Sequence, residues 1–409
     1  MEALRAARLL GVSLPFDLSA SGLRVGDERV VDFLATFSRE LLALGRRYPE
    51  LASLGFFLRR AEVERQLSRL DGLRRPCGVV FHVPPANVDT VFVYSWALSA
   101  LAGNTNVVRI SPRAGAAARA ILDVWRSIDD PVIARTQHLI TYDRDDELTA
   151  ALSVAADLRV LWGGDESVRA LRRFPLAPHA RDLTFPDRSS FAIVSVDGWQ
   201  RSTEAERRAA VEGFFNDAYW FDQAACSSPR GVFWVGGEQG AARGERDAGA
   251  AARRTDRVRV SRDDSDPSAE FRALLVAVAR EKGHVIEPAM AVQKRVSAYG
   301  AAADGRVSKI HFDSGSVTSL ESGELLREWL GAGVFTHSRV SSLDEVVPLV
   351  VRKDQTVTHF GFSREELLDF AGKAGVDRVV PFGSALTFSP IWDGYDLLAQ
   401  FTKLVTVTV

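Results

Sequence analysis

Apolar segments of two kinds alternate along the chain from residue 76 onward. Short apolar runs with the length of buried strands lie at residues 79–83, 107–110, 138–142 and 158–162. Longer segments with helical spacing lie at residues 88–102, after Ser111-Pro112, around residues 147–156 and after Gly163-Gly164. Strands that alternate with helices form a parallel sheet covered by helices, with ligands at the carboxyl ends of the strands. The pattern therefore predicts an α/β fold.

A second series of strands and helices begins after residue 185. We expect a strand at residues 191–196, a helix that starts with the capping box Thr203-Glu204-Ala205-Glu206, and a buried strand at residues 231–235. The chain before residue 76 has helical periodicity, clearest at residues 61–70. The pattern therefore predicts two parallel-sheet α/β domains and a final strand. The first domain, which includes the helical lead-in, covers residues 1–185. The second covers residues 186–395, and the final strand covers residues 396–409.

Three outlying segments carry weaker patterns. Arg5 and Arg8 stand among short apolar stretches, which predict a surface helix and not a signal peptide. Residues 236–266 are rich in Gly, Ala, Arg and Asp, and predict a solvated helix-and-loop excursion. The alternation over residues 404–409 is typical of a strand at the end of the chain.

Composition narrows the class of protein. The 409 residues are 46% hydrophobic, enough for two or three ordinary cores, and the net charge of -2 excludes the basic field that concentrates nucleic acid. The apolar stretch at residues 88–102 is too short to span a bilayer. Two cysteines, Cys77 and Cys226, supply neither a disulfide framework nor a thiolate metal site. We expect a soluble, metal-free cytoplasmic protein.

Cys226 is the foremost candidate for chemistry. It follows a helix with apolar positions from Ala210 to Ala218 and precedes the strand at residues 231–235, so it lies on a loop supported from both sides. A cysteine on such a loop is a candidate nucleophile, and the alternative is a small buried hydrophobe. The residues alone leave both interpretations open.

Motifs in three parts of the chain resemble aldehyde dehydrogenases, in the order of that family. The first runs from Gly78 to Asn87 and continues with Leu101-Ala102-Gly103-Asn104 and a strand that ends at Arg109, where the family has a cofactor-binding lysine. The second is Gln223-Ala224-Ala225-Cys226, and the third joins Pro381-Phe382-Gly383 to residues 401–407. The resemblance covers roughly residues 76 to 409 and implies a Rossmann-like cofactor domain, a catalytic domain and an oligomerisation strand.

Within that superfamily, residues 222–229 and Trp392-Asp393-Gly394-Tyr395 are most similar to the acyl-CoA reductases that supply fatty aldehyde to bacterial luciferase. The resemblance implies that Cys226 attacks a thioester, while the Asn87 amide and the Cys226 backbone N–H stabilise the oxyanion. Standing alone, Asn87 is an ordinary turn residue after two prolines.

The same resemblance assigns the cofactor residues. Gly163-Gly164 matches the family's Gly-Ser turn, where a helix N-terminus faces a pyrophosphate, although a double glycine is otherwise just a tight turn. NAD-preferring relatives often carry a glutamate three residues after the lysine, and Pro112 stands there. Together with Arg109 and Arg113, this favours NADPH. Arg113 can instead simply begin a solvated helix.

One departure from the family separates the possible reactions. Hydrolytic members carry a glutamate that activates water, and alignment places Thr184 at that position. A threonine is a poor general base near neutral pH, so attack by water should be slow. A glutamate from elsewhere, such as Glu212, could take over the role of the base. We therefore expect an NADPH-dependent reductase of acyl-CoA or acyl-carrier-protein thioesters. The alternatives are a hydrolytic aldehyde dehydrogenase and a non-reducing acyl-carrying or scaffold subunit.

The terminal strand also predicts assembly. An unpaired edge strand needs a partner, and in the family that this chain resembles it joins the sheet of a neighbouring subunit. We expect a homodimer or homotetramer whose interface includes residues 399–409. Pairing within the same chain is the alternative.

Overall fold

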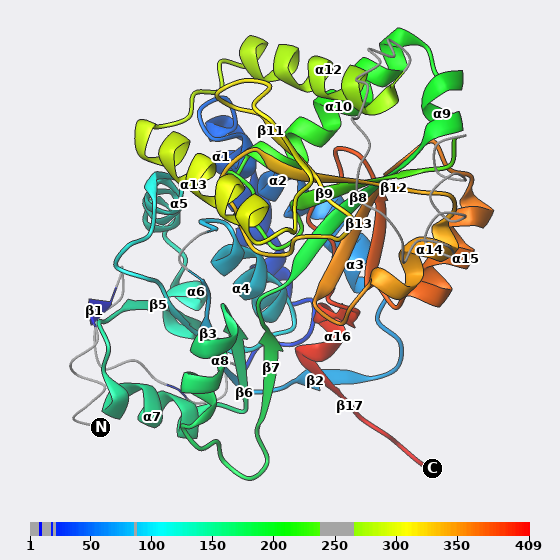
Figure 1. Ribbon diagram of the computed structural model, residues 1–409. Coiled ribbons are helices and arrows are strands. Elements are labelled where there is room, and N and C mark those ends of the chain that lie inside the picture. Colours follow the sequence, from blue (N-terminus) through cyan, green and yellow to red (C-terminus); the bar gives the residue numbers. More distant parts are fainter. Residues whose placement is uncertain (1–7, 10–17, 19–21, 86–87, 238–265) are drawn as a thin grey trace. The chain divides into compact units, whose positions relative to one another are not determined.

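The computed structural model describes residues 8–9, 18, 22–85, 88–237 and 266–409. The chain divides into two compact units, one comprising Met1–Asp187 and Thr387–Val409 and the other Arg188–Leu386 (Figure 1). No helix in the described part combines the length and apolar character that crossing a bilayer requires. The predicted surface helix near the N-terminus and the excursion at residues 236–266 fall largely outside the described residues.

The first unit contains a predominantly parallel sheet. Its described strands are β1 (Arg8–Leu9), β3 (Val79–Val83), β4 (Thr105–Arg109), β5 (Gln137–Thr141), β6 (Leu158–Trp162) and β7 (Arg181–Phe185). They lie in the order β1-β5-β4-β3-β6-β7, and β1 alone among them is antiparallel to its neighbour. The strand order reverses between β3 and β6, which is where doubly wound folds place their ligands.

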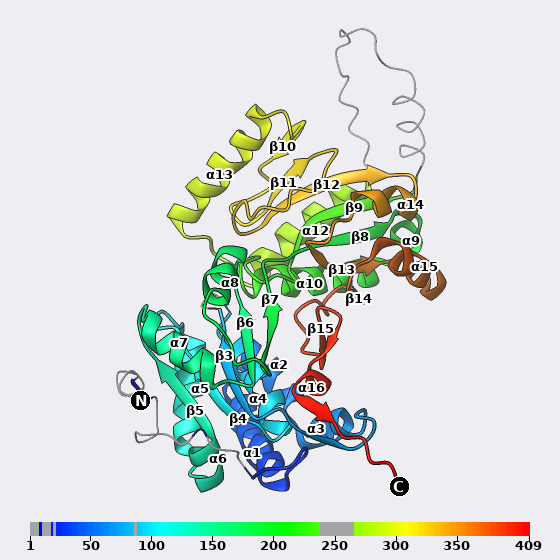
Figure 2. The same ribbon diagram turned by 90° about the horizontal axis from the view of Figure 1, so that it is seen from below.

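Helices cover both faces of this sheet (Figure 2). Those that pack with one core are α1 (Glu28–Leu44), α2 (Pro49–Phe57), α3 (Arg60–Leu67), α4 (Val91–Leu101), α5 (Ala116–Ser127), α6 (Pro131–Thr136) and α16 (Leu397–Gln400). Those on the other core are α7 (Asp146–Ala155) and α8 (Asp165–Arg172). Because both faces are covered, β3 and β6 are buried at every position, which explains why their residues are apolar except for His82 and Arg159.

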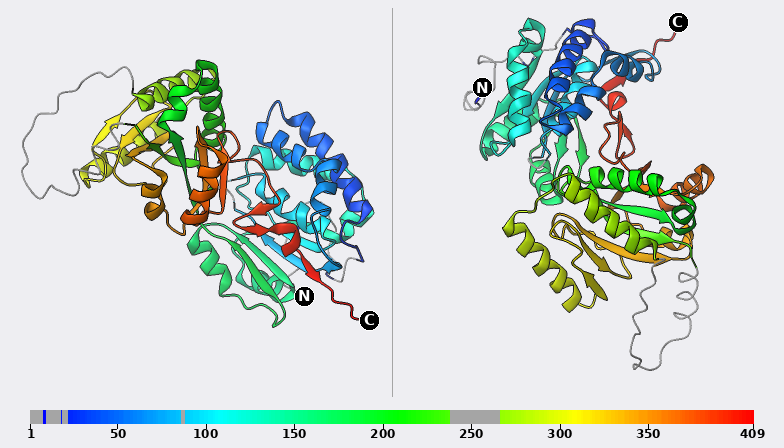
Figure 3. Two further views of the ribbon diagram at one scale, coloured as in Figure 1. Left: turned by 90° about the vertical axis from the view of Figure 1, so that its right-hand side faces the viewer. Right: turned by 90° about the horizontal axis from the view of Figure 1, so that it is seen from above.

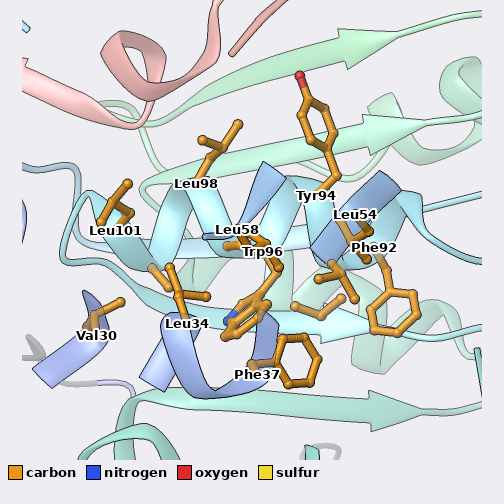
Figure 4. Close-up of a cluster of buried hydrophobic side chains, with 14 of the residues drawn as sticks. Val30, Leu34, Phe37, Leu54, Leu58, Phe92, Tyr94, Trp96, Leu98 and Leu101 are labelled. Carbon is orange, nitrogen blue, oxygen red and sulfur yellow. The ribbon is translucent and has the colours of Figure 1, made fainter. Parts of the chain in front are cut away.

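Helix α4 lies at the centre of the larger core. Every residue from Phe92 to Leu101 is buried, so the helix has no polar face. The ring of Trp96 lies next to Phe37 of α1, with centroids 6.1 Å apart (Figure 4). Its indole N–H reaches Gln137 Oε1 at 2.8 Å, so the polar edge of this buried ring is satisfied.

Asn104 joins three segments of the first unit. Its Oδ1 accepts the backbone N–H of Gly78, while its Nδ2 donates to the carbonyls of Ser99 and Phe401 at 3.1 and 2.9 Å. The side chain is completely buried. The Ala-Gly-Asn turn of the sequence is therefore a junction between the start of β3, the end of α4 and the C-terminal segment.

The second unit contains a sheet of similar design (Figure 3). Its described strands are β8 (Ser189–Ser195), β9 (Pro229–Val235), β10 (Lys309–His311), β11 (Thr318–Glu321), β12 (Val334–Val340), β13 (Asp354–Phe360) and β14 (Arg378–Pro381). They lie in the order β10-β11-β12-β9-β8-β13-β14, with β10 antiparallel to β11 and the other pairs parallel.

Alternate residues of β8 face different cores. Ala192 and Val194 pack with α10 and α12, whereas Phe191 and Ile193 pack with α14 and α15. The helices of this unit are α9 (Val196–Arg201), α10 (Glu204–Tyr219), α12 (Pro267–Glu281), α13 (Pro288–Ala303), α14 (Leu343–Val346), the 3-10 helix η2 (Val347–Leu349) and α15 (Arg364–Ala374). The predicted capping box of α10 is present, with Thr203 and Glu206 bonded to each other's backbone.

The C-terminal segment differs from the prediction. Residues 387–395, expected in the second domain, group with the first unit, where Phe388 packs on Tyr94 at 5.2 Å between ring centroids. The hairpin of β15 (Ile391–Trp392) and β16 (Tyr395–Asp396) follows. The predicted strand at residues 404–409 is instead β17 (Thr402–Leu404), antiparallel to β2 (Arg74–Pro76) of the same chain. One further backbone bond, from the Val405 N–H to the Leu73 carbonyl at 2.8 Å, joins the two segments beyond β17.

Near the N-terminus, Arg8–Leu9 is an extended strand and not part of a helix. It pairs with β5 through Arg8 opposite Thr141 and Leu9 opposite Ile140. An edge strand of a parallel sheet offers unpaired backbone groups, and this short segment satisfies some of those of β5.

Substituting Asn104 by Ala tests the junction. The change leaves the partly buried N–H of Gly78 and the buried carbonyl of Phe401 without this partner, which should lower the unfolding free energy by about 2–4 kcal/mol. Urea denaturation followed by circular dichroism measures the loss. The control is Asp123→Ala, which removes an exposed partner of Arg126 and should change stability by less than about 1 kcal/mol. Equal losses in the two variants would contradict the role of Asn104.

Candidate active site

A cleft of about 1020 Å³ opens at the carboxyl ends of β3, β4, β5 and β6 in the first unit. It contains Pro84 and Pro85 after β3 and residues from Trp162 to Gly164 after β6. β3 and β6 are the two strands that flank the reversal in strand order. The cleft thus occupies the ligand site expected from the topology, and its volume lies at the upper end of the usual range of small-molecule pockets.

The predicted residues Arg109, Arg113, Gly163 and Gly164 all line this cleft. Arg109 ends β4, with its guanidinium 4.7 Å above the ring centre of Tyr142 and its Nη2 donating to the Tyr142 carbonyl at 3.2 Å. Its Nε is buried and has no hydrogen-bond partner within the described structure. An unsatisfied guanidinium donor in a ligand cleft fits an anionic group.

The two glycines leave room for a ligand between β6 and α8. Gly163 has φ +152°, a conformation that side chains rarely adopt, and a Cβ at Gly164 would meet no atom within 4 Å. Gly164 is the N-cap of α8, so the first N–H groups of that helix face the open side. Acidic residues stand in the first turn, but Arg169 pairs with both Asp165 and Glu166. Arg169 thus offsets part of the negative charge that would oppose an anion at this helix N-terminus.

Cys226 lies in the second unit, on the turn between α10 and β9. The turn contains two non-glycine residues in the left-handed region, Asp222 with φ 47° and Gln223 with φ 59°. Residues in this conformation persist where the surrounding structure holds them, and they cluster at functional sites. The predicted helix, polar turn and strand around Cys226 are all present.

The side chain of Gln223 fixes this turn. Its Nε2 donates to the carbonyls of Pro229 and Val334 at 3.0 and 3.1 Å, and its Oε1 accepts the Val334 N–H at 3.1 Å. Gln223 is only 1% exposed. The amide therefore takes the place of a neighbouring strand for Val334, the first residue of β12.

Two serines hold the backbone on either side of the thiol. Ser190 of β8 donates its hydroxyl to the Cys226 carbonyl at 2.7 Å and accepts the N–H of Thr356 at 3.2 Å. Ser228, fully buried, donates to the carbonyl of Asp217 on α10 at 2.7 Å. The role of Ser190 could not be recognised from the sequence, since its partners come from the turn before β9 and from β13.

Asp222 forms the outer side of the turn. Its carbonyl accepts the indole N–H of Trp329 at 3.0 Å, and its carboxylate lies 3.1 Å from His284 Nε2. Trp329 is 41% exposed, so one face of its ring remains accessible beside the turn. Neither residue was identified from the sequence, which separates them widely from Cys226.

The two cysteines have different surroundings. Cys226 is partly exposed, whereas Cys77 is 4% exposed at the start of β3. Burial raises the pKa of the Cys77 thiol, which lowers its reactivity. Cys77 therefore has the packing role expected of it.

The residues considered for activating water occupy different environments. Thr184 lies on β7, opposite Leu161, and is partly buried. Glu212 on α10 pairs with Arg208 at 3.2 Å, and Arg208 also binds Glu281 of α12. Glu212 thus belongs to an ion-pair network between two helices.

Asn87 lies outside the described residues. In the described parts of the chain, no group of three or more His, Cys, Asp or Glu side chains is arranged to hold a metal ion. The structure thus brings together the four predicted cofactor residues and describes Cys226 within the other unit.

The fold is that of the aldehyde dehydrogenases. A solved structure of 1-pyrroline-5-carboxylate dehydrogenase from Thermus with bound NAD matches with a TM-score of 0.60, covering 92% of this chain and 80% of that one at 14% identity. The acyl-CoA reductase (LuxC) family matches residues 56–404, and the chain belongs to this family.

Curated relatives carry the name long-chain acyl-protein thioester reductase. The one from Aliivibrio fischeri is 26% identical over 166 residues, 40% of this chain and 33% of that protein. The one from Photorhabdus luminescens is 22% identical over 349 residues, 81% of this chain and 63% of that protein. The chain thus matches less than two thirds of the length of these relatives.

Proposed function

We propose that the protein is an NADPH-dependent reductase that converts an acyl thioester to an aldehyde through an S-acyl intermediate on Cys226. The observation that carries the proposal is the partly exposed residue Cys226 on a turn fixed by Gln223 and Ser190. Membership of the acyl-CoA reductase family supports it. The names of the relatives support an acyl thioester as substrate, carried by a protein or by CoA.

The first half of the reaction is acyl transfer. The Cys226 thiolate attacks the thioester carbonyl, a C–S bond forms, and the bond to the carrier sulfur breaks as the carrier thiolate leaves. The hydrogen bonds of the turn fix the Cys226 backbone, which reduces the entropy lost on reaching the transition state. Asn87 and the Cys226 N–H are the proposed donors to the oxyanion.

The second half restores the thiol. A nicotinamide held in the cleft would supply the hydride that reduces the S-acyl group. Collapse of the resulting thiohemiacetal breaks its C–S bond, releases aldehyde and returns the Cys226 thiolate. Arg109, Arg113 and the turn at Gly163-Gly164 are the proposed residues for holding the cofactor.

The surroundings of Thr184 and Glu212 favour acyl transfer over hydrolysis. A threonine is a weak base, and Glu212 is held in an ion pair with Arg208. A hydrolytic dehydrogenase would give acid from aldehyde, and a non-reducing acyl carrier would bind no nicotinamide. Product analysis with NADPH and acyl-CoA separates the three functions.

Preference for NADPH rests on the charge at the end of β4. Arg109 has an unsatisfied buried donor, Arg113 is exposed in the same cleft, and Pro112 stands where a repelling carboxylate would lie. Guanidinium groups bind phosphate through strong charge-assisted hydrogen bonds.

The C-terminal segment has exposed strand edges that could join two subunits. Lys403 opposes Arg75 in the β17–β2 ribbon, and residues 406–409 beyond it are exposed. This ribbon leaves strand edges that another subunit can pair with. We propose a homodimer or homotetramer whose interface includes residues 399–409.

Acyl transfer predicts a covalent adduct. Incubation with acyl-CoA in the absence of NADPH should add one acyl mass to Cys226, as measured by intact and peptide mass spectrometry. Cys77 should remain unmodified because it is buried. In Cys226→Ala the adduct should disappear, and an adduct that persists would overturn the assignment. Cys77→Ala is the matched control and should acylate normally.

Cofactor choice predicts a preference in kcat/KM. NADPH should exceed NADH by about tenfold or more, and Arg113→Ala should remove most of that preference by raising KM for NADPH. Arg135→Ala, an exposed arginine outside the cleft, is the control. Equal efficiency with both cofactors, unchanged in Arg113→Ala, would refute the preference.

The assembly proposal predicts a change of mass on truncation. Ending the chain at Val405 keeps buried Phe401 and the β17–β2 pairing but removes four exposed residues. Light scattering should show a lower oligomeric mass with an unchanged circular dichroism spectrum. A full-length monomer, or a truncated chain of unchanged subunit number, would count against this interface.

A further inference from the structure

Asp217 is a buried carboxylate on α10 that the proposed mechanism does not use. It is 1% exposed, and it lies nine residues before Cys226 in the sequence. A buried carboxylate is costly unless its oxygens are hydrogen-bonded, so its partners indicate what it does.

The carboxylate binds the loop that follows β14. Oδ2 accepts the N–H of Gly383 at 2.7 Å, and Oδ1 accepts the N–H of Ala385 at 2.8 Å. Arg378 holds the same loop from its other side by donating to the carbonyls of Ser384 and Ala385. The loop at residues 381–386 is therefore fixed to the side chain of Asp217 by two charge-assisted bonds.

Backbone contact reinforces this attachment. Gly213, one turn before Asp217 on α10, lies so close to the loop that a Cβ there would stand 2.9 Å from Gly383 N and from the Phe382 carbonyl carbon. Gly383 has φ +89°, which favours glycine at that point. The helix and the loop thus approach at backbone distance.

The backbone of Asp217 binds a different segment. Its carbonyl accepts the hydroxyl of Ser228, two residues after Cys226, at 2.7 Å. One residue of α10 therefore contacts the turn that carries the thiol through its backbone and the loop at residues 381–386 through its side chain.

We propose that Asp217 is a positioning residue that fixes the Cys226 turn relative to the loop at residues 381–386, and that the acyl-transfer step depends on this attachment. The proposal deepens the proposed function and rests on it for its kinetic test. Asp217 acts through the backbone of α10 and through Ser228, without contact with the substrate.

Protonation supplies a readout specific to this role. Burial raises the pKa of Asp217 to about 7, against the opposing effects of the Gly383 and Ala385 N–H groups and of Arg378, the charged group that faces it. In a protonated carboxyl one oxygen carries the proton and loses its negative charge, so it accepts an N–H bond more weakly than a carboxylate oxygen does. Below the pKa, one of the two loop bonds is therefore weakened.

Asp217→Asn tests the proposal because the amide oxygen can accept only one of the two loop N–H groups, those of Gly383 and Ala385. The amide NH₂ faces the other N–H group and cannot bind it. Single-turnover acylation of Cys226 by acyl-CoA should slow by about tenfold to a hundredfold above the pKa of Asp217, with little change in the concentration of acyl-CoA at half saturation. The ratio of wild-type to variant rates should fall toward one below that pKa. The thiol's own ionisation is common to both proteins and cancels in this ratio.

The control is Asp266→Asn, which removes another carboxylate of the same unit. Asp266 caps α12 and pairs with Arg339, near the carboxyl ends of β9 and β12. This variant should lose thermal stability and acylate at the wild-type rate. Equal slowing in both variants, or a wild-type to Asp217→Asn ratio that does not change with pH, would overturn the positioning role.

A second measurement separates this proposal from the proposed function. If the wild-type protein accepts no acyl thioester, the reductase function fails. Alkylation of Cys226 by iodoacetamide then reports the state of the turn without substrate. Asp217→Asn should change that rate at least about threefold relative to the wild type and to Asp266→Asn, by altering exposure of the thiol, and an unchanged rate would refute the attachment.

Discussion

The turn between α10 and β9 must reverse the chain while its peptide groups are buried, and this requirement controls the arrangement around Cys226. Gln223 meets it with a side chain that binds both backbone groups of Val334 and the carbonyl of Pro229. An unpaired peptide group in that setting would cost about 1–3 kcal/mol, so the amide fixes the register of the turn as well as its shape. The left-handed conformations of Asp222 and Gln223 follow from that constraint.

Other contacts of the second unit build on the same turn. Ser190 connects the Cys226 carbonyl to β13, and Trp329 binds the Asp222 carbonyl from the outside. Each of these bonds ends on the backbone and not on a side chain of the turn. The position of the thiol is thus set by peptide geometry, which requires few particular residues in the stretch Ala224-Ala225-Cys226.

Local sequence patterns predicted the elements that depend on local forces. The strands at residues 79–83 and 158–162 were predicted residue for residue because burial on both faces makes them mostly apolar, with His82 and Arg159 as the exceptions. The capping box of α10 was also confirmed, since it needs residues only three apart. By contrast, Asp217 binds a loop 166 residues further along the chain, and nothing near it in the sequence indicates that partner. The terminal strand was wrong in its extent because its pairing partner, β2, is distant in the sequence and local alternation does not indicate where that pairing ends.

The two units position their proposed functional groups by different means. In the first, four parallel strands end at one edge, and the reversal of strand order leaves a cleft there without any special side chain. In the second, Cys226 lies just before the amino end of β9, where the strand order supplies no such opening. The peptide groups of this turn come before the paired part of β9, so strand pairing does not satisfy them. Buried polar side chains have to complete the hydrogen bonds at that end. This explains why the first site could be located from topology, whereas the turn around Cys226 depends on individual residues such as Gln223, Ser190 and Ser228.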